Sequence, residues 1–252
     1  MLKILALDIE TAPHIAYVWG LWSQNIATNQ IQQPGYTLCW AAKWIGDVGV
    51  KHGSLWADGK EEMLRKLVTL LDEADAVVHY NGNKFDIPRL NTEFLSVGIP
   101  PYAPFKPIDL YPIVRKQFAF ASNKLDYVCQ ALGIGKKVKH RGMDMWRDVM
   151  NGDAKSQEQM MVYNIQDVVL LEDLYFHILP WIVNHPNHGL YVDTEMYVCP
   201  NCGSLHVEKR GFYHAKTQVY QKMRCLDCGK WSRYRTTILT REKRAVIGVG
   251  VE

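Results

Sequence analysis

Residues 2–11 read LKILALDIET, an almost continuous apolar run of strand length that two carboxylates interrupt near its end. Successive side chains of a β-strand point to opposite faces, so Asp8 and Glu10 share one face and Ile9 lies on the other. Two like charges in a partly buried site raise each other's pKa unless a cation lies between them. Because hard carboxylate oxygens favour Mg²⁺ or Mn²⁺, this strand predicts a site for such a metal.

The segments after this strand predict an α/β domain. Stretches rich in β-branched and aromatic residues predict further strands, and apolar residues at helical spacing predict helices. Several strands followed by helix, strand and helices are typical of a mixed sheet flanked by helices. The expected strands are 15–22, 37–45, 48–56 and 76–80, the expected helices are 63–71, 88–98, 124–132 and 157–182, and a proline-rich loop is expected at 99–107.

Two later elements carry further acidic residues. Asp86 follows the predicted strand 76–80 in a loop before a helix, where α/β sheets gather functional groups, although helix capping is its structural alternative. Tyr163 and Asp167 lie four residues apart in the last predicted helix and therefore share one face. Taken alone, these two residues also fit a core aromatic and a solvated acid.

The joint pattern is Asp-x-Glu, then Asn-x-x-x-Phe-Asp, then Tyr-x-x-x-Asp. It resembles the three exonuclease motifs of the DEDD superfamily, tyrosine subtype, which includes the proofreading domains of family B DNA polymerases. Val162 occupies the place where the histidine subtype has its histidine. The resemblance covers residues 2–180 and implies a ribonuclease H-like fold. The residues that carry it are Asp8, Glu10, Asn81, Phe85, Asp86, Tyr163 and Asp167.

This resemblance implies a 3′-to-5′ exonuclease that hydrolyses phosphodiester bonds with two Mg²⁺ or Mn²⁺ ions. By the same resemblance Asp8 bridges both ions, Glu10 and Asp167 complete one site and Asp86 serves the other. The phenol of Tyr163 is then expected to orient the attacking water. Thr11, Asn81 and Phe85 are the candidates for holding the terminal nucleotide.

The expected substrate is nucleic acid, either single-stranded DNA or 3′ ends, and no motif separates DNA from RNA. Two alternatives stay open at this point. One is a structure-specific endonuclease on the same fold, and the other is a non-catalytic nucleic-acid-binding protein.

Four of the six cysteines form two Cys-x-x-Cys-Gly sequences, Cys199 to Gly203 and Cys225 to Gly229. This spacing predicts a four-cysteine zinc site, and the glycines permit the tight turns that such a site needs. Because protein would fill all four positions, we expect one structural Zn²⁺. A disulfide pair, unused thiols, or His206 or His214 in place of one sulfur are the alternatives.

The basic excess of the chain lies in residues 190–252, where basic and aromatic side chains alternate. Such mixing is typical of proteins that neutralise phosphates and stack on the bases of a single strand. In the alternative interpretation the aromatic residues form a small core and the charges a solvated face. The candidate nucleic-acid contacts are Lys222, Arg224, Lys230, Trp231, Arg233, Tyr234 and Arg235.

The sequence thus predicts a ribonuclease H-like domain over residues 1–184, a linker over 185–194 and a small β zinc ribbon over 195–252. With 48 % apolar and 22 % charged residues and a mean hydropathy of −0.18, the chain falls outside the disordered class. It shows no signal-peptide pattern and no apolar stretch of the ~20 residues that cross a bilayer. We therefore expect a cytoplasmic protein of a bacterial or phage-infected cell, without membrane partners or small-molecule cofactors.

Overall fold

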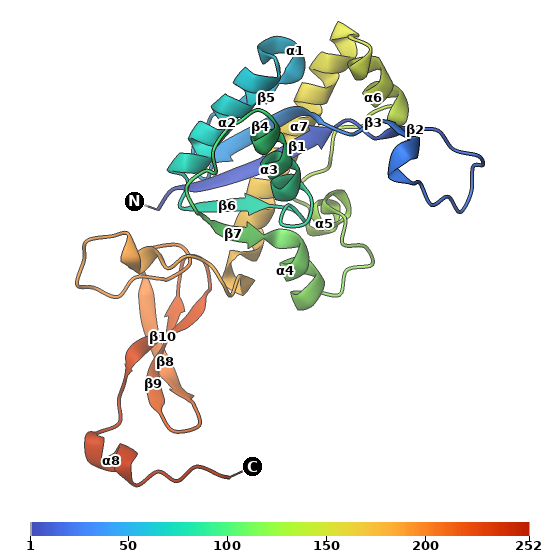
Figure 1. Ribbon diagram of the computed structural model, residues 1–252. Coiled ribbons are helices and arrows are strands. Elements are labelled where there is room, and N and C mark those ends of the chain that lie inside the picture. The colour runs from blue at the N-terminus through green and yellow to red at the C-terminus, as the bar shows by residue number, and fades with distance from the viewer. Residues whose placement is uncertain (1, 252) are drawn as a thin grey trace. The chain divides into compact units, whose positions relative to one another are not determined.

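The computed structural model describes residues 2–251, which form two compact units (Figure 1). The N-terminal unit is Lys3–Tyr175, and the C-terminal unit consists of the residues from Phe176 onward together with Leu2. The division lies inside the long helix α7 (Ala154–Ile178), upstream of the linker expected at 185–194. Among the described residues, no helix is both long and apolar enough to span a bilayer.

The N-terminal unit is built on a five-stranded mixed sheet, as the sequence predicts. In spatial order its strands are β5 (Lys51–Ser54), β4 (Thr37–Trp44), β1 (Ile4–Thr11), β6 (Ala76–His79) and β7 (Lys106–Asp109). β1 pairs antiparallel with β4 and parallel with β6, so it is the strand at which the direction of the sheet changes. The chain therefore has the predicted ribonuclease H-like arrangement, with the first strand at its centre.

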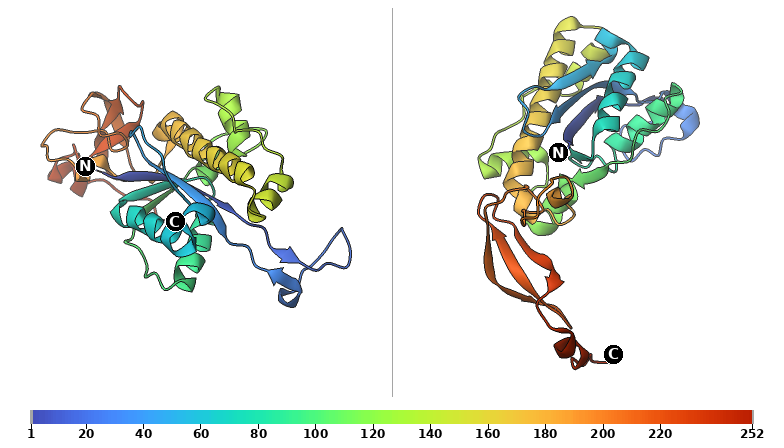
Figure 2. Two further views of the ribbon diagram at one scale, coloured as in Figure 1. Left: turned by 90° about the horizontal axis from the view of Figure 1, so that it is seen from above. Right: turned by 90° about the vertical axis from the view of Figure 1, so that its left-hand side faces the viewer.

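Helices cover both faces of this sheet, and the two views of Figure 2 place α7 opposite α2 (Lys60–Glu73) and α3 (Asp86–Ser96). Leu5, Leu7 and Ile9 of β1 pack with the buried leucines of α2 in one apolar core. The even-numbered residues of β1, including both carboxylates, therefore face the α7 side. On that side Lys43 of β4 and Glu172 of α7 form a buried ion pair that joins the helix to the sheet.

Shorter helices complete this unit: α1 (Leu55–Asp58), α4 (Leu110–Gln117), α5 (Leu125–Leu132) and α6 (Met143–Met150). The sequence analysis missed α4 and α6, and β7 lies partly in the expected proline-rich loop. Pro107 belongs to β7, the edge strand of the sheet, where a residue without an N–H is tolerated. Because proline favours loops, the sequence pattern did not predict β7 as a strand.

Two expected strands were too long. The segment 15–22 forms only the two-residue β2 (Ile15–Ala16), which pairs with β3 (Ile31–Gln33), because its aromatic residues have no apolar partner and stay exposed. The segment 48–56 ends as a strand at Ser54, whose hydroxyl caps α1 by accepting from the Ala57 N–H. The last helix starts at Ala154 and ends at Ile178, slightly earlier than expected at both ends.

The C-terminal unit contains a three-stranded antiparallel sheet with β9 (Val219–Cys225) between β8 (Val207–His214) and β10 (Trp231–Thr237). A short helix, α8 (Arg241–Ala245), follows it, and two 3₁₀ turns, η2 (Leu179–Trp181) and η3 (His188–Leu190), precede it. Few apolar side chains are buried here, and two of the buried residues are Cys199 and Cys225. The predicted small β ribbon around cysteines is thus confirmed.

Polar contacts join the cysteine turns to the segment 179–182 within this same unit. Asn201 donates from Nδ2 to the carbonyls of Leu179 and Ile182 at 2.8 and 3.0 Å. The Lys230 ammonium donates to the carbonyls of Pro180 and Ile182 at 3.0 and 2.9 Å. Lys230, one of the expected nucleic-acid contacts, therefore has its charge engaged by backbone carbonyls.

Candidate active site and zinc site

The two carboxylates of β1 face α7, which carries the polar residues that meet them. Asp8 Oδ2 accepts a hydrogen bond of 2.7 Å from Nδ2 of Asn164, a fully buried residue of α7. Asp167 lies one turn further along the helix and is 1 % exposed. One carboxylate oxygen each from Asp8, Glu10 and Asp167 lies within 4.8 Å of the others. The structure therefore brings three of the predicted acids to one point.

This donor set fits a hard cation. Oδ1 of Asp167 is buried and has no hydrogen-bond partner, although a buried carboxylate oxygen is normally paired. Three carboxylate oxygens at one place also repel one another unless a positive charge joins them. Oxygen-only ligands of this kind suit Mg²⁺ or Mn²⁺.

Asp86 is the fourth predicted acid and lies outside that cluster, buried at the first position of α3. Its position depends on the loop after β6, in which Asn81 adopts a left-handed conformation with φ 66°. A Cβ on Gly82 would lie 2.6 Å from His79 Cγ and 2.8 Å from Asp86 Oδ2. Only glycine leaves room for the Asp86 carboxylate in this loop.

Asp109, at the end of β7, fixes the same loop from below. Its Oδ1 accepts from the Asn81 N–H at 2.8 Å, and its Oδ2 accepts from the Asn83 N–H at 3.3 Å. The imidazole Nδ1 of the buried His79 accepts from the Gly82 N–H at 3.1 Å. The sequence analysis found neither Asp109 nor His79, and the signal it could have used is an acidic residue at the end of a strand that is parallel to β6.

The acids are electrostatically strained without a cation. Burial raises the pKa of Glu10 to about 8 and that of Asp86 to about 7. Burial also raises the pKa of Asp8 well above its usual range, and the charges of Glu10, Asp86 and Asp167 add to this. Asp86 therefore lies close enough to act on Asp8, although it does not join the three-oxygen cluster.

Lys137 supplies the positive charge that the cluster has in this structure. Its ammonium forms an ion pair with the buried Asp167 and donates to the Tyr163 hydroxyl at 2.9 Å. Burial alone lowers the pKa of this lysine, but the Asp167 charge and the two hydrogen bonds outweigh burial and raise it. Lys137 was not predicted, because it lies in an irregular basic segment between α5 and α6.

Tyr163 has aromatic neighbours from this segment and from α6. The ring of His140 lies edge-on to it at 5.0 Å, and the Trp146 ring lies at 6.2 Å. Nε1 of Trp146 in turn donates to the Thr11 carbonyl at 3.2 Å. Burial raises the pKa of Tyr163, so its phenol stays neutral. The predicted pair of Tyr163 and Asp167 on one helix face is present.

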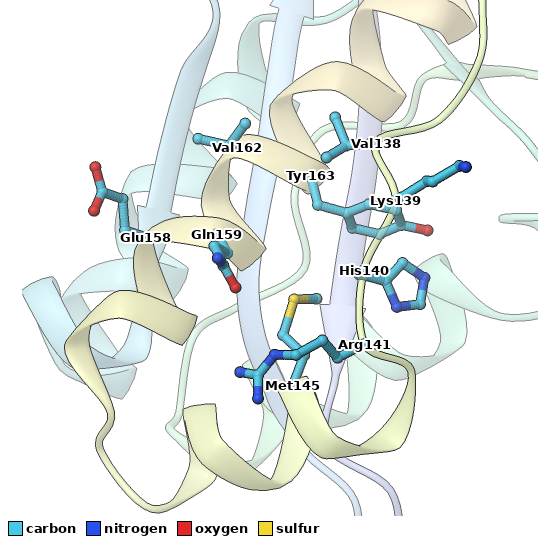
Figure 3. A pocket seen from close by; sticks show the side chains of 9 residues that line it. All are labelled: Val138, Lys139, His140, Arg141, Met145, Glu158, Gln159, Val162 and Tyr163. Carbon is cyan, nitrogen blue, oxygen red and sulfur yellow. The ribbon is translucent and has the colours of Figure 1, made fainter.

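Two cavities meet at these residues. One, of about 670 Å³, is lined by Asp8, Asn81, Lys124, Lys137 and Tyr163 among others. The second, of about 530 Å³, has Lys139, Arg141 and Glu158 in its wall, and Figure 3 shows His140 and Tyr163 at its edge. Asp8 is thus accessible from the larger of these two cavities, and basic side chains line both.

The remaining predicted contacts of this unit lie around the cavities. Phe85 is 51 % exposed at the start of α3. Thr11 lines a third cavity of about 350 Å³ together with Trp146. Asn81 lines the cavity of about 670 Å³ beside Asp8. These positions fit the expected contact role, but no observation assigns them a ligand.

The four predicted zinc ligands come together in the C-terminal unit. Cys199, Cys202, Cys225 and Cys228 place their sulfurs within 4.8 Å of one another, and none forms a disulfide. Sγ of Cys199 lies 3.5 Å from that of Cys228, and Sγ of Cys202 lies 3.6 Å from that of Cys225. This cluster can hold a zinc ion with all four positions filled by protein.

The two cysteine turns have the same hydrogen-bond pattern. Gly203 N–H donates to the Cys199 carbonyl at 2.9 Å, and Gly229 N–H donates to the Cys225 carbonyl at 3.2 Å. Both glycines have positive φ, 74° and 78°, as the sequence analysis expected of these tight turns. Neither His206 nor His214 joins the cluster among the described residues, and His206 instead lies 3.2 Å from an Asp227 oxygen.

One face of the ribbon sheet alternates cations and rings. Register pairs Trp231 with Arg224 and Arg233 with Lys222, so these four side chains share a face. The Lys222 ammonium lies 5.1 Å from the Trp231 ring centre, and the Arg233 guanidinium lies 3.8 Å from that of Tyr220. We call this set, together with Tyr220, the cation–aromatic face: Tyr220, Lys222, Arg224, Trp231 and Arg233. Arg235, a further predicted contact, lies in the part of β10 after Arg233 where the register shifts.

Tyr234 differs from the other predicted contacts of β10. Its ring packs against that of Tyr197 with centres 4.8 Å apart, and Tyr197 donates to the neighbouring Ser232 hydroxyl at 2.8 Å. The alternation of β10 turns Ser232 and Tyr234 away from Arg233. Tyr234 therefore belongs to the small core of the unit.

Comparison with known proteins gives three likenesses. The sequence model of the RNase H superfamily matches residues 54–179. A DNA polymerase from Methanocaldococcus jannaschii is 28 % identical over 132 residues, which is 43 % of this chain and 8 % of the polymerase. The family B DNA polymerase from the archaeon Pyrobaculum calidifontis superposes with a TM-score of 0.55 and 21 % identity, over 71 % of this chain and 25 % of that one.

These likenesses reach only part of each molecule. The chain spans less than a tenth of one polymerase and a quarter of the other. The superfamily match contains Asp86, Tyr163 and Asp167, while Asp8 and Glu10 lie before it. Similarity of fold therefore covers the N-terminal unit, and the placement of Asp8 and Glu10 beside Asp167 comes from the structure itself.

Proposed function

Because the chain belongs to the RNase H superfamily, we propose that it is a metal-dependent nuclease that removes nucleotides from the 3′ end of a nucleic-acid strand. The observation that carries the proposal is the cluster of Asp8, Glu10 and Asp167 oxygens within 4.8 Å. Asp8, one of the three acids, lines a cavity of about 670 Å³ together with Lys137 and Tyr163. The 3′-to-5′ direction rests on the resemblance of the motifs to the exonuclease motifs of the DEDD superfamily.

In this proposal Asp8, Glu10 and Asp167 hold two Mg²⁺ or Mn²⁺ ions, and Asp86 contributes from the edge of the cluster. When bound, such ions lower the pKa of the attacking water and offset the charge that builds up on the leaving oxygen. The neutral phenol of Tyr163 orients that water through a hydrogen bond. Lys137 holds the phenol by its 2.9 Å hydrogen bond, and its ion pair with Asp167 would be exchanged for the metal if an ion bound there.

The cation–aromatic face of the ribbon is proposed to bind the same strand by phosphate neutralisation and base stacking. Its cations already lie against its rings, so binding does not require them to be ordered first. Lys230 and Tyr234 are left out of this surface because both are engaged inside the unit. The zinc ion has a structural role and takes no part in hydrolysis.

The test is digestion of matched single-stranded DNA and RNA oligonucleotides, each labelled at the 5′ end, with Mg²⁺ or Mn²⁺. A 3′-to-5′ exonuclease shortens the labelled strand in single-nucleotide steps and leaves a covalently closed circle intact. Asp8→Asn and Asp167→Asn are expected to abolish the shortening of the labelled strands. Cleavage of the circle would replace the proposal by the endonuclease, and absence of any product with both metals would contradict it.

A further inference from the structure

Residues 15–33, here called the finger, contain a separate two-stranded sheet between β1 and β4 that no part of the active site uses. It consists of the short strands β2 and β3 with the loop and the 3₁₀ turn η1 (Thr28–Gln30) between them. In Figures 1 and 2 it projects from the N-terminal unit beyond the end of β1. Its side chains are unusual for a projection into water.

The loop of the finger presents large apolar side chains. Trp19 exposes 98 % of its surface, and Leu21 and Trp22 expose 85 % each. Tyr17 exposes 69 %. Scattered exposed apolar residues are common on proteins, but two almost fully exposed tryptophans and a tyrosine within six residues indicate an interaction surface.

The finger also lacks charge. No Asp, Glu, Lys or Arg occurs between Glu10 and Lys43, and the finger instead contains many Asn and Gln side chains. Without carboxylates the finger does not repel phosphates, and without cations it does not attract them. Affinity for nucleic acid at this place must then come from ring stacking on bases, which is independent of base sequence.

The base of the finger is fixed to the catalytic elements. The finger begins at Ile15, five positions after Glu10. The Ala12 N–H donates to the carbonyl of Tyr36, in the segment between β3 and β4, at 2.8 Å. Arg89 of α3 donates to the Gly35 carbonyl at 2.8 Å, and an added Cβ on Gly35 would lie 2.6 Å from the Ala12 carbonyl oxygen. The stem therefore has a defined direction relative to the acids.

The stem of the finger is internally ordered as well. Gln30 donates from Nε2 to the Tyr17 carbonyl and accepts at Oε1 from the Ala27 N–H, both at 2.9 Å. The Tyr17 N–H donates to the Gln30 carbonyl at 2.9 Å. Such a stem holds the rings of the tip away from the domain, where both faces of a ring can be reached.

We propose that the finger is a stacking surface for unpaired bases of the strand whose 3′ end occupies the active site. This inference rests on the proposed function and adds the substrate class, a single strand several nucleotides long. Trp19 lies nine positions after Glu10. At ~3.3 Å per residue this is a reach of at most about 30 Å. At ~3.4 Å per stacked nucleotide the finger contacts bases up to about nine nucleotides from the reacting end.

The experiment compares the wild-type chain with the double variant Trp19→Ala/Trp22→Ala. Without added divalent metal, a 20-nucleotide single strand is expected to quench the tryptophan fluorescence of the wild type. It should bind the double variant roughly tenfold more weakly, because the contacts between the indole rings and stacked bases are lost. Trp19→Phe/Trp22→Phe should recover most of the affinity. A 20-unit abasic strand, which carries phosphates but no bases, should bind wild type and double variant equally.

Leu95→Ala is the matched control, since Leu95 exposes 81 % of its surface on α3 and lies outside the finger. With Mg²⁺, the ratio of kcat/KM for the 20-mer to kcat/KM for a trinucleotide should fall about tenfold in the double variant and stay constant in the control. The melting temperature of all variants should match the wild type, because the replaced side chains are exposed.

Equal binding of the 20-mer by wild type and double variant would overturn the inference. If the finger then bound a protein instead, it would be a protein-docking surface. The titration requires no hydrolysis, so it decides on the finger even if no nucleotide is released. Absence of hydrolysis of both substrates by the wild type would contradict the proposed function alone.

Discussion

Asp167 has two oxygens in different situations. Oδ2 pairs with the Lys137 ammonium, while Oδ1 is buried without a partner. A carboxylate that is 1 % exposed and only half satisfied is costly to the folded state unless a further cation completes it. At the scale of single residues, the acids are therefore arranged to bind a cation. The phenol of Tyr163 beside them has a different role.

Tyr163→Phe and Asp167→Asn should separate these two roles. Tyr163→Phe removes a hydroxyl that binds no hard cation, so calorimetric titration should show unchanged Mn²⁺ binding while turnover falls by about a hundredfold, a typical size for lost proton-transfer assistance. Asp167→Asn should lose both metal binding and turnover. Loss of Mn²⁺ binding in Tyr163→Phe would contradict the assigned roles.

The pH dependence of stability has a definite sign at this site. In the folded, metal-free protein, burial raises the pKa of Glu10 to about 8 and that of Asp86 to about 7, whereas both ionise near about 4 when unfolded. The folded state then binds more protons than the unfolded state between these values, so the free energy of unfolding decreases as pH rises from about 4 to 8.

Urea denaturation of the protein without added divalent metal, at several pH values between 5 and 8, should show this decrease. Mg²⁺ should stabilise the protein more at pH 8 than at pH 6, because at pH 6 protons compete for the same oxygens. Glu10→Gln should flatten the dependence. A metal-free protein that became more stable towards pH 8 would contradict the burial of these acids.

At the scale of elements, the loop after β6 is closely packed around Gly82, and the addition of one methyl group there tests this packing. Gly82→Ala places its Cβ against His79 and the Asp86 carboxylate and is expected to cost about 1–3 kcal/mol of stability, as overpacking does, and to lower turnover. Gly49→Ala is the matched control, because nothing lies within 4 Å of its Cβ position. Thermal unfolding and single-strand digestion of both variants measure the difference, and equal behaviour of the two would remove the proposed constraint on Asp86.

The sequence predicted those elements whose pattern is local. β1 and β6 appear as apolar runs, and Tyr163 and Asp167 share a helix face because of their spacing alone. Lys137, Asn164 and Asp109 could not be found in this way, since each acts on a residue from a distant segment. Asn164, for example, is 156 positions from its partner Asp8. The segment 15–22 of the finger was predicted as a strand because aromatic residues favour strands, although no partner covers them.

At the scale of the whole molecule, the C-terminal unit depends on its metal more than the N-terminal unit does. Its buried apolar residues are few, and its four sulfurs meet at one point. Zinc binding supplies much of the folding energy of such small modules. When a chelator removes one Zn²⁺ per chain, the circular dichroism spectrum should therefore lose the β signal of this unit and keep the helical signal of the other. Cys225→Ser should behave like the chelated protein, and a ribbon that stays folded after zinc removal would refute the structural role.

In the proposed function the acids hydrolyse the strand and the ribbon binds it. This requires that the cation–aromatic face neutralises phosphates. Each phosphate contact contributes about 0.7 to the slope of log affinity against log salt for a single strand. Lys222→Ala/Arg224→Ala/Arg233→Ala should therefore reduce this slope by about 2, while the metal affinity of the acids stays unchanged. Arg241→Ala/Lys243→Ala/Arg244→Ala removes the same charge from α8, which lies outside the ribbon sheet. Equal slopes for the two triple variants would mean that the ribbon acts through its total charge, and the alternation of rings and cations on one face would then have no role in recognition.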